Sequence, residues 1–199
     1  MNTLYSIGVL RTGQLAHALK DLFIDATTER WITDAVVRWQ RILICGCGGS
    51  HADAIHFAEE LTGRYKGHKI AYPAFALGTN PGHLTCVAND YGFEHVFQRE
   101  LEAHTRVGYP SDNLLIAMTT SGTTSAIHRV VEFAAEKGIR CLVLTGIGGK
   151  ARWGANSPRE SQLIHFIEAG DTPATTQEIH MHLLHTICEF ITERLPDGD

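Results

Sequence analysis

Hydrophobic residues follow two different patterns along the chain. Over residues 3–22 and 27–40 they recur at near-helical intervals, which predicts two amphipathic helices forming a leading helical hairpin. After residue 40, short apolar runs alternate with further helical patterns. These runs predict five buried strands, at residues 42–45, 74–77, 114–118, 141–144 and 163–167.

The remaining helical patterns cover residues 50–66, 82–104, 122–138 and 173–194. Strands that alternate with helices favour an α/β fold, a three-layer sandwich with a five-stranded parallel sheet covered on both sides. Because 199 residues with 44% hydrophobic content can bury one full core, we expect a single domain. Its parts are a hairpin over residues 1–40, used in oligomerisation, and an α/β core over residues 41–194.

Glycine, proline and serine interrupt residues 146–160 repeatedly, so we expect this stretch to form a loop near the site. A net charge of −5 with 20% charged residues gives no basic stripe for nucleic acid. The first residues lack the features of a signal peptide, and no apolar run reaches membrane-spanning length, so we expect a cytoplasmic protein. The five cysteines form no Cys-x-x-Cys pair, and only Cys47, in a glycine turn, is a candidate to face a site.

Two helical segments carry groups suited to metal binding or proton transfer. His56 and Glu60 are four residues apart, so their side chains lie on neighbouring turns of one helix face. Gln177 and His185 are eight apart, a rotation of roughly 80°, and share a face as well. Two imidazoles, a carboxylate and an amide oxygen are suitable for a divalent metal or an acid/base pair. The simpler alternative for His56 and Glu60 is a hydrogen bond on the protein surface.

Two turns that follow predicted strands have the composition of anion sites. Residues 46–50, Gly-Cys-Gly-Gly-Ser, follow the first strand, and residues 119–125, Thr-Thr-Ser-Gly-Thr-Thr-Ser, follow the third. In parallel sheets ligands bind at the carboxyl ends of strands, where free N–H groups of the next helix attract anions.

Neither turn continues as Gly-Lys-Ser/Thr, which excludes a Walker loop, and the glycines do not complete Gly-x-Gly-x-x-Gly. A hydroxyl-rich turn without lysine suits a phosphate monoester carried on a sugar. The alternative for these hydroxyl residues is simple helix capping.

The chain resembles the bacterial sedoheptulose 7-phosphate isomerases, or phosphoheptose isomerases, of the sugar isomerase (SIS) domain superfamily. The matching motifs occur in family order over residues 40–194, and the leading helices fit as well. They lie at residues 46–54, 56–65, 88–93, 119–122, 144–146 and 177–180, followed by His185.

The resemblance implies a flavodoxin-like SIS fold and a homotetramer with active sites between subunits. It implies an aldose–ketose isomerase that interconverts sedoheptulose 7-phosphate and D-glycero-D-manno-heptose 7-phosphate through an enediol, the first step of nucleotide-activated heptose biosynthesis. One Zn²⁺ per subunit is expected. Its ligands would be His56, Glu60, Gln177 and His185.

The resemblance also assigns substrate contacts. Glu60 is the candidate base and His185 its acid/base partner, while Gln177 lines the substrate site too. The remaining implied contacts to the substrate are Ser50, Arg64, Asn89, Asp90, Thr119, Thr120, Ser121 and Thr124. Taken alone, Asp90 has helix capping as an equally good interpretation, and Arg64 could be a cation at a subunit interface.

The chain departs from the family pattern at four places. Cys47 and Thr123 replace asparagines of the two turns. The segment 147–149 lacks an acidic residue that usually stands there, and residues 174–176 lack an arginine. These changes leave the proposed metal and acid/base residues intact.

Two other interpretations remain open. One is a non-catalytic SIS-fold scaffold or phosphosugar sensor, of the kind that associates with replication initiators. The other is an isomerase for a different phosphosugar. The complete set of four convergent ligands favours an enzyme, because a scaffold does not need them.

Overall fold

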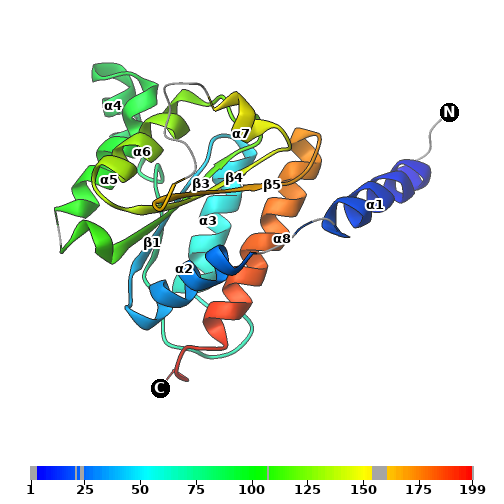
Figure 1. Ribbon diagram of the computed structural model, residues 1–199, viewed down its shortest axis with the longest axis horizontal. Coiled ribbons are helices and arrows are strands. Elements are labelled where there is room, and N and C mark those ends of the chain that lie inside the picture. Colours follow the sequence, from blue (N-terminus) through cyan, green and yellow to red (C-terminus); the bar gives the residue numbers. More distant parts are fainter. Residues whose placement is uncertain (1–3, 21, 23–24, 107, 154–160, 199) are drawn as a thin grey trace.

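Figure 1 shows a computed structural model of the chain, in which residues 4–20, 22, 25–106, 108–153 and 161–198 are described. Five strands form one sheet in the order β2-β1-β3-β4-β5, and every neighbouring pair is parallel. The predicted five-stranded parallel sheet is therefore confirmed. The strands are β1 (Arg41–Cys45), β2 (Ala74–Ala76), β3 (Asn113–Thr119), β4 (Arg140–Thr145) and β5 (Ile164–Glu168).

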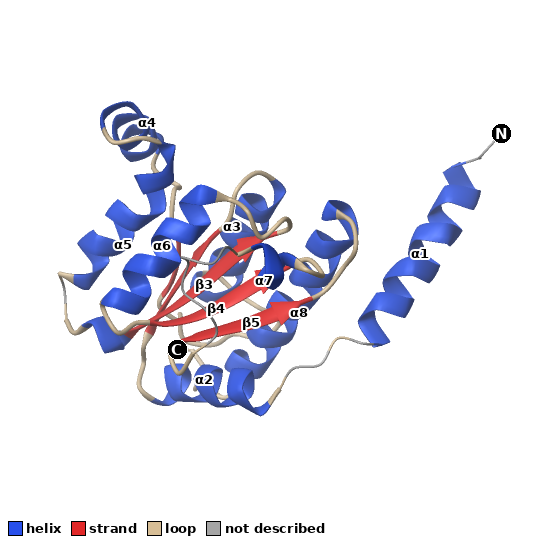
Figure 2. Cartoon of the chain, turned by 45° about the horizontal axis from the view of Figure 1, so that its top comes forward, coloured by secondary structure: helices blue, strands red, loops and turns tan. Residues whose placement is uncertain are grey.

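Helices cover both faces of the sheet, as the alternating pattern predicts (Figures 1 and 2). Helices α2, α3 and α8 pack on one face, and α4, α5 and α6 on the other. Their bounds are α1 (Leu4–Lys20), α2 (Ala26–Val37), α3 (Gly49–Thr62), α4 (Pro81–Asp90), α5 (Val96–Thr105), α6 (Ser125–Glu136), α7 (Gly149–Arg152) and α8 (Pro173–Thr192), with short 3-10 turns η1 (Phe93–His95) and η2 (Pro110–Asp112).

Strand β3 shows why the apolar runs read as buried strands. Leu114, Ile116 and Met118 point toward α2, α3 and α8, whereas Leu115 and Ala117 point toward α5 and α6. Successive side chains of a strand face opposite sides, so a central strand covered twice must be apolar at every position. All seven residues of β3 are buried.

The helix predicted over residues 82–104 is wrong as one continuous element. Helix α4 ends at Asp90, and Gly92 has a φ of 96°, a left-handed conformation that ends a helix. This positive φ, rather than a lack of space, is what favours glycine there. The chain then continues through η1 into α5.

The leading helices exist, but they do not form the predicted hairpin within this chain. Helix α1 projects from the body, and its contacts are with α8, including an ion pair between Arg11 and Glu178 (Figures 1 and 2). Val9 is 54% and Leu10 62% exposed. Helix α1 therefore leaves apolar residues exposed. Its amphipathic pattern correctly predicts a helix, but that pattern does not identify the surface against which the helix packs.

The loop expected over residues 146–160 is partly helical. Residues 149–152 form α7, and Trp153 after it is only 2% exposed. Residues 154–160 lie outside the described part of the chain. Within the described residues, none of the helices has the length and apolar content needed to cross a lipid bilayer.

Candidate functional site

The two predicted anion turns lie side by side at one edge of the sheet. Strands β1 and β3 are direct neighbours, with Cys45 beside Ala117 at their carboxyl ends. Helix α3 leaves β1 toward one face, and α6 leaves β3 toward the other. This is the point where the strand order reverses, and a ligand binds in the crevice that such a reversal leaves.

The first turn brings helix α8 close to the start of α3. A Cβ on Gly49 would lie 2.4 Å from Nε2 of Gln177, so only glycine leaves room for this amide. Gly48, which precedes α3, has a φ of 61°, another position that favours glycine. Ser50 is 2% exposed in the first turn of α3. The glycines thus let Gln177 reach the turn that the sequence predicts to bind phosphate.

The second turn gathers its hydroxyl groups into one cluster. Oγ1 of Thr119 lies 2.9 Å from Oγ1 of Thr124, and Oγ of Ser121 lies 2.9 Å from Oγ1 of Thr123. Thr124 stands at the N-cap of α6, yet its side chain makes no capping hydrogen bond. Simple capping therefore does not account for Thr124. Thr120 is half-buried, with its carbonyl directed toward Gly146.

The predicted metal and acid/base residues meet between α3 and α8. Nε2 of His56 lies 3.0 Å from Oε1 of Glu60 and 3.2 Å from Nε2 of His185. His56 is exposed, whereas Glu60 and His185 are half-buried. Among the described residues, these three are the group of histidine, cysteine and acidic side chains placed to hold a metal ion.

The donor atoms fit a tetrahedral metal. Two ligands bound to zinc at the usual distances lie about 3.3 Å apart. The separations of 3.0 and 3.2 Å that involve His56 are close to that value. Two imidazole nitrogens this close share at most one hydrogen, so lone pairs face the common space. Nitrogen and carboxylate ligands of this kind suit Zn²⁺.

Gln177 lies nearer the N-terminal ends of the same two helices. Gln177 is close to Gly49 and His185 is close to His56, so α3 and α8 run side by side in the same direction. The structure therefore brings three of the four expected ligands together. It turns the amide of Gln177 toward the first turn.

Three expected substrate contacts do not join the site within one chain. Asn89 and Asp90 are exposed on α4, on the far side of the sheet from α3 and α8, and Nδ2 of Asn89 donates to Oδ1 of Asp90 (Figure 1). Asp90 is the last residue of α4, and the following η1 and α5 have no side-chain capping hydrogen bond, so Asp90 does not cap the helix that follows. Arg64 is exposed just beyond the end of α3.

One partly buried acidic residue near the predicted ligands was not singled out from the sequence. Asp53 lies one turn before His56 on α3, and burial raises the pKa of its carboxyl, while His56 acts in the opposite direction. Its Oδ2 is buried without a hydrogen-bond partner. The three-residue spacing from His56 was the available signal, because it places Asp53 beside the same helix face.

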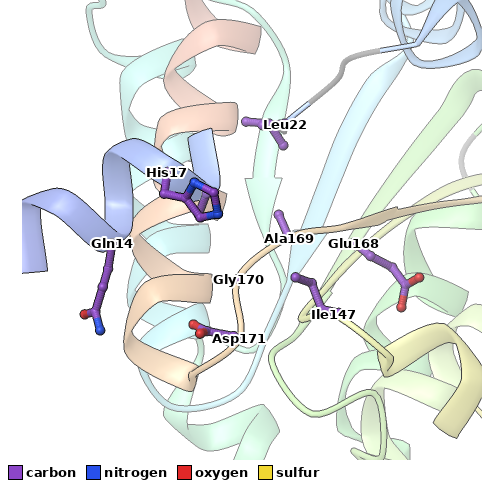
Figure 3. Close-up of a pocket in the computed structure, with 9 residues that line it drawn as sticks. Gln14, His17, Leu22, Ile147, Glu168, Ala169, Gly170 and Asp171 are labelled. Atoms are coloured by element: carbon purple, nitrogen blue, oxygen red, sulfur yellow. The ribbon is translucent and has the colours of Figure 1, made fainter. Parts of the chain in front are cut away.

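Among the cavities near these elements, two bear on the site. One of about 500 Å³ opens beside His185 and is lined by Tyr65 and by α8. Another of about 300 Å³ lies between α1 and the loops after β4 and β5, where His17 and Gln14 face Asp171 and Ile147 (Figure 3). None of the predicted site residues lines this second cavity. Its walls include α1, so it depends on where that helix packs.

Comparison with known proteins gives the family. The SIS domain family matches residues 24–146. The phosphoheptose isomerase of Sodalis glossinidius is 42% identical over 165 residues, which cover 82% of this chain and 79% of that protein. The chain belongs to the phosphoheptose isomerase family.

Solved phosphoheptose isomerase structures have the same fold. The enzyme from Neisseria gonorrhoeae superposes with a TM-score of 0.73 at 29% identity, covering 96% of this chain and all of the other. The one from Francisella tularensis gives a TM-score of 0.80 at 24% identity, covering 97% of this chain and all of the other. This confirms the predicted SIS superfamily.

Proposed function

We propose that the chain is a sedoheptulose 7-phosphate isomerase, which forms D-glycero-D-manno-heptose 7-phosphate as the first step of nucleotide-activated heptose biosynthesis. The observation that carries this proposal is the meeting of His56, Glu60 and His185 on α3 and α8, with Gln177 of α8 against Gly49 of the first turn and the clustered hydroxyls of the second turn at the end of the neighbouring strand. Membership of the phosphoheptose isomerase family supports it.

The chemistry requires a proton to move between C1 and C2 of the sugar. Glu60 removes the proton from C2 of the aldose, leaving an enediol, and returns it to C1 to give the ketose. His185 moves the second proton, from the hydroxyl on C2 to the oxygen on C1. Its ring lies next to His56, so it can be oriented by that contact.

A divalent metal, which we take to be Zn²⁺ with one ion per subunit, fits the same donor set. His56, Glu60 and His185 would hold it, with Gln177 as a fourth ligand after its side chain turns from Gly49. When bound, the metal would polarise the sugar carbonyl as a Lewis acid. Glu60 would then be both a ligand of the metal and the base, and coordination would lower its basicity.

The phosphate group of the substrate would bind at the carboxyl ends of β1 and β3, where the two turns lie. Ser50, Thr119, Ser121 and Thr124 surround the two turns, with Thr120 beside them. The N-termini of α3 and α6 open onto the same crevice, without side-chain capping bonds. Backbone N–H groups and hydroxyls together give an anion site without lysine.

We also propose a homotetramer with sites between subunits. Asn89 and Asp90 lie on exposed α4, away from the ligands of their own chain, so a neighbouring subunit would supply them. Exposed apolar residues on α1 and α3, such as Leu10 and Ile55, support further association. All five cysteines are unpaired, which supports a reducing, cytoplasmic location.

The test is an exchange experiment with a matched variant. Zinc-supplemented protein is incubated with sedoheptulose 7-phosphate in heavy water and followed by NMR. We expect new aldose signals carrying deuterium at C2. Glu60→Gln should lose roughly two to four orders of magnitude in rate, while Glu59→Gln, an exposed neighbour on the same helix, should keep it.

The outcomes separate the competing functions. Near-normal turnover of Glu60→Gln contradicts the role of Glu60. No exchange in the wild-type protein, together with measurable phosphosugar binding, would favour another sugar substrate or a non-catalytic sensor. Bound metal in the wild-type protein that is lost when any of the four proposed ligand residues is replaced would support an enzyme rather than a scaffold.

A further inference from the structure

Two side chains from outside the second turn form hydrogen bonds with two consecutive backbone carbonyl groups of that turn. Nε of Arg152 donates to the carbonyl of Ser121 at 2.9 Å. Nε2 of His128 lies 2.8 Å from the carbonyl of Gly122. Since a carbonyl oxygen only accepts, Nε2 of His128 carries the hydrogen. Neither residue belongs to the hydroxyl turn or to the metal site.

His128 is held in place by aromatic packing. Its ring packs against that of Trp153 at an angle of 40°, with 4.1 Å between the ring centroids. Trp153 is 2% exposed and contacts Phe166 of β5 edge-on at 5.2 Å. The imidazole therefore has little freedom to turn away from Gly122.

Arg152 links the turn to the segment after β4. Besides Ser121, its Nη2 donates to the carbonyl of Ile147 at 3.2 Å. Gly122 itself, at a φ of 72°, packs against the backbone of Gly149 so closely that a Cβ would lie 2.3 Å from the Gly149 oxygen. Helix α7 and the second turn thus form one unit, with Arg152 on its exposed surface.

The amide groups of the same peptides point to hydroxyl oxygens. The N–H of Gly122 donates to Oγ1 of Thr119 at 3.2 Å, and the N–H of Thr123 donates to Oγ of Ser121 at 3.2 Å. Within a planar trans peptide the carbonyl and the N–H point in opposite directions. Holding the carbonyls of Ser121 and Gly122 on one side therefore holds these two N–H groups on the other.

This arrangement decides where the hydroxyl protons can go. A hydroxyl that already accepts an N–H is left with its own proton to donate. The carbonyls of Ser121 and Gly122 each already accept a hydrogen bond, from Arg152 and His128. The hydroxyls of Thr119 and Ser121 contact those of Thr124 and Thr123 at 2.9 Å, and an anion bound at the turn can accept their protons in place of these contacts.

We propose that Arg152 and His128 are positioning residues that keep the second turn as a set of donors for the phosphate of a sugar phosphate. They do not touch the phosphate themselves. They act through the peptides of Ser121 and Gly122, which they orient, and Arg152 adds positive charge behind an otherwise uncharged turn. The inference rests on the proposed function for the identity of the sugar, but not for the binding of phosphate.

Four variants test the inference. Arg152→Leu removes the donors from an exposed side chain, and His128→Phe keeps a ring against Trp153 but removes the donor. His128→Gln retains a donor and should restore part of the effect. Arg129→Leu is the matched control, because Arg129 lies on α6 beside His128 but is exposed and pairs with Glu132.

Two measurements are made on each protein: kcat and KM with sedoheptulose 7-phosphate, and the Kd for inorganic phosphate by ³¹P NMR titration. We expect Arg152→Leu and His128→Phe each to raise KM and the phosphate Kd about tenfold, with kcat near the wild-type value. Arg129→Leu should change neither constant. A purely structural role would instead lower kcat and thermal stability without a selective effect on phosphate.

Unchanged phosphate affinity in both Arg152→Leu and His128→Phe overturns the inference. If His128→Phe is too unstable to measure, the phosphate Kd and KM of Arg152→Leu decide the question, because Arg152 is exposed and its replacement should not unfold the protein. Wild-type protein that fails to isomerise the heptulose yet binds phosphate in a manner dependent on Arg152 refutes the proposed substrate and upholds the inference. Normal isomerisation with insensitive variants refutes the inference and upholds the function.

Discussion

Replacing His180 with leucine should make the protein less sensitive to acid. His180 lies on α8 and is 1% exposed, and burial lowers its pKa from the ordinary 6.5 to about 4. The nearby backbone of Thr145 acts in the opposite direction, raising the pKa. It forms no hydrogen bond of normal geometry with the imidazole, since neither ring nitrogen of His180 has a hydrogen-bond partner. Folding therefore buries a neutral imidazole.

The sign and size of the effect follow from linkage. Between about pH 6.5 and 4 the unfolded chain binds a proton at this residue and the folded chain does not, so stability falls as the pH falls. A shift of this size corresponds to about 3 kcal/mol of unfolding free energy lost across that window. Leucine replaces ring nitrogens that have no partner, so it should cost little at neutral pH.

Urea unfolding of metal-free protein, repeated at several pH values, measures this difference. Chelation removes the contribution of the metal ligands. His104, whose pKa is lowered by burial and by Arg41, loses stability in the same direction but is present in both proteins and cancels. We expect the free energy of His180→Leu to fall about 3 kcal/mol less than that of the wild type. Parallel pH profiles for the two proteins would refute the argument.

Three further predictions concern the site. Gln177→Leu should lower zinc occupancy at limiting metal, because it removes the amide oxygen of the proposed fourth ligand; full occupancy would argue against Gln177 as a ligand. Gly122→Ala, with a φ of 72° and a Cβ 2.3 Å from Gly149, should destabilise by about 2 kcal/mol or more in urea unfolding, and an unaltered midpoint would contradict this. Chelation should abolish isomerisation but leave the ³¹P phosphate titration unchanged, and added zinc should restore turnover; activity that survives chelation would count against the metal.

The sheet and the pairing of His56 with Glu60 could be predicted because they depend on local periodicity. A strand such as β3, buried on both faces, has to be apolar throughout, and the spacing of His56 and Glu60 fixes their common face whatever surrounds them. That His185 lies close to His56 could not be predicted from local spacing alone. That prediction also required the ordered motifs that the chain shares with the family.

The features that could not be predicted depend on contacts between distant segments. Nothing in the spacing of Arg152 or His128 points to the turn at Ser121, because α7 and α6 meet only after the sheet forms. The break at Gly92 was hidden since the helical period continues across it. Asp90 lies on exposed α4, and its proposed place between subunits depends on a neighbouring chain.

Helix α3 carries both ends of the proposed site, and this makes it a molecular ruler. Ser50 stands in its first turn and His56 six residues later, a rise of about 9 Å along a rigid axis. A sugar whose phosphate is held near Ser50 reaches the metal-binding end only if its carbon chain spans that interval. Shorter phosphosugars would bind by the same phosphate but stop before Glu60, so the length of a helix, rather than any hydroxyl contact, would select for a seven-carbon substrate.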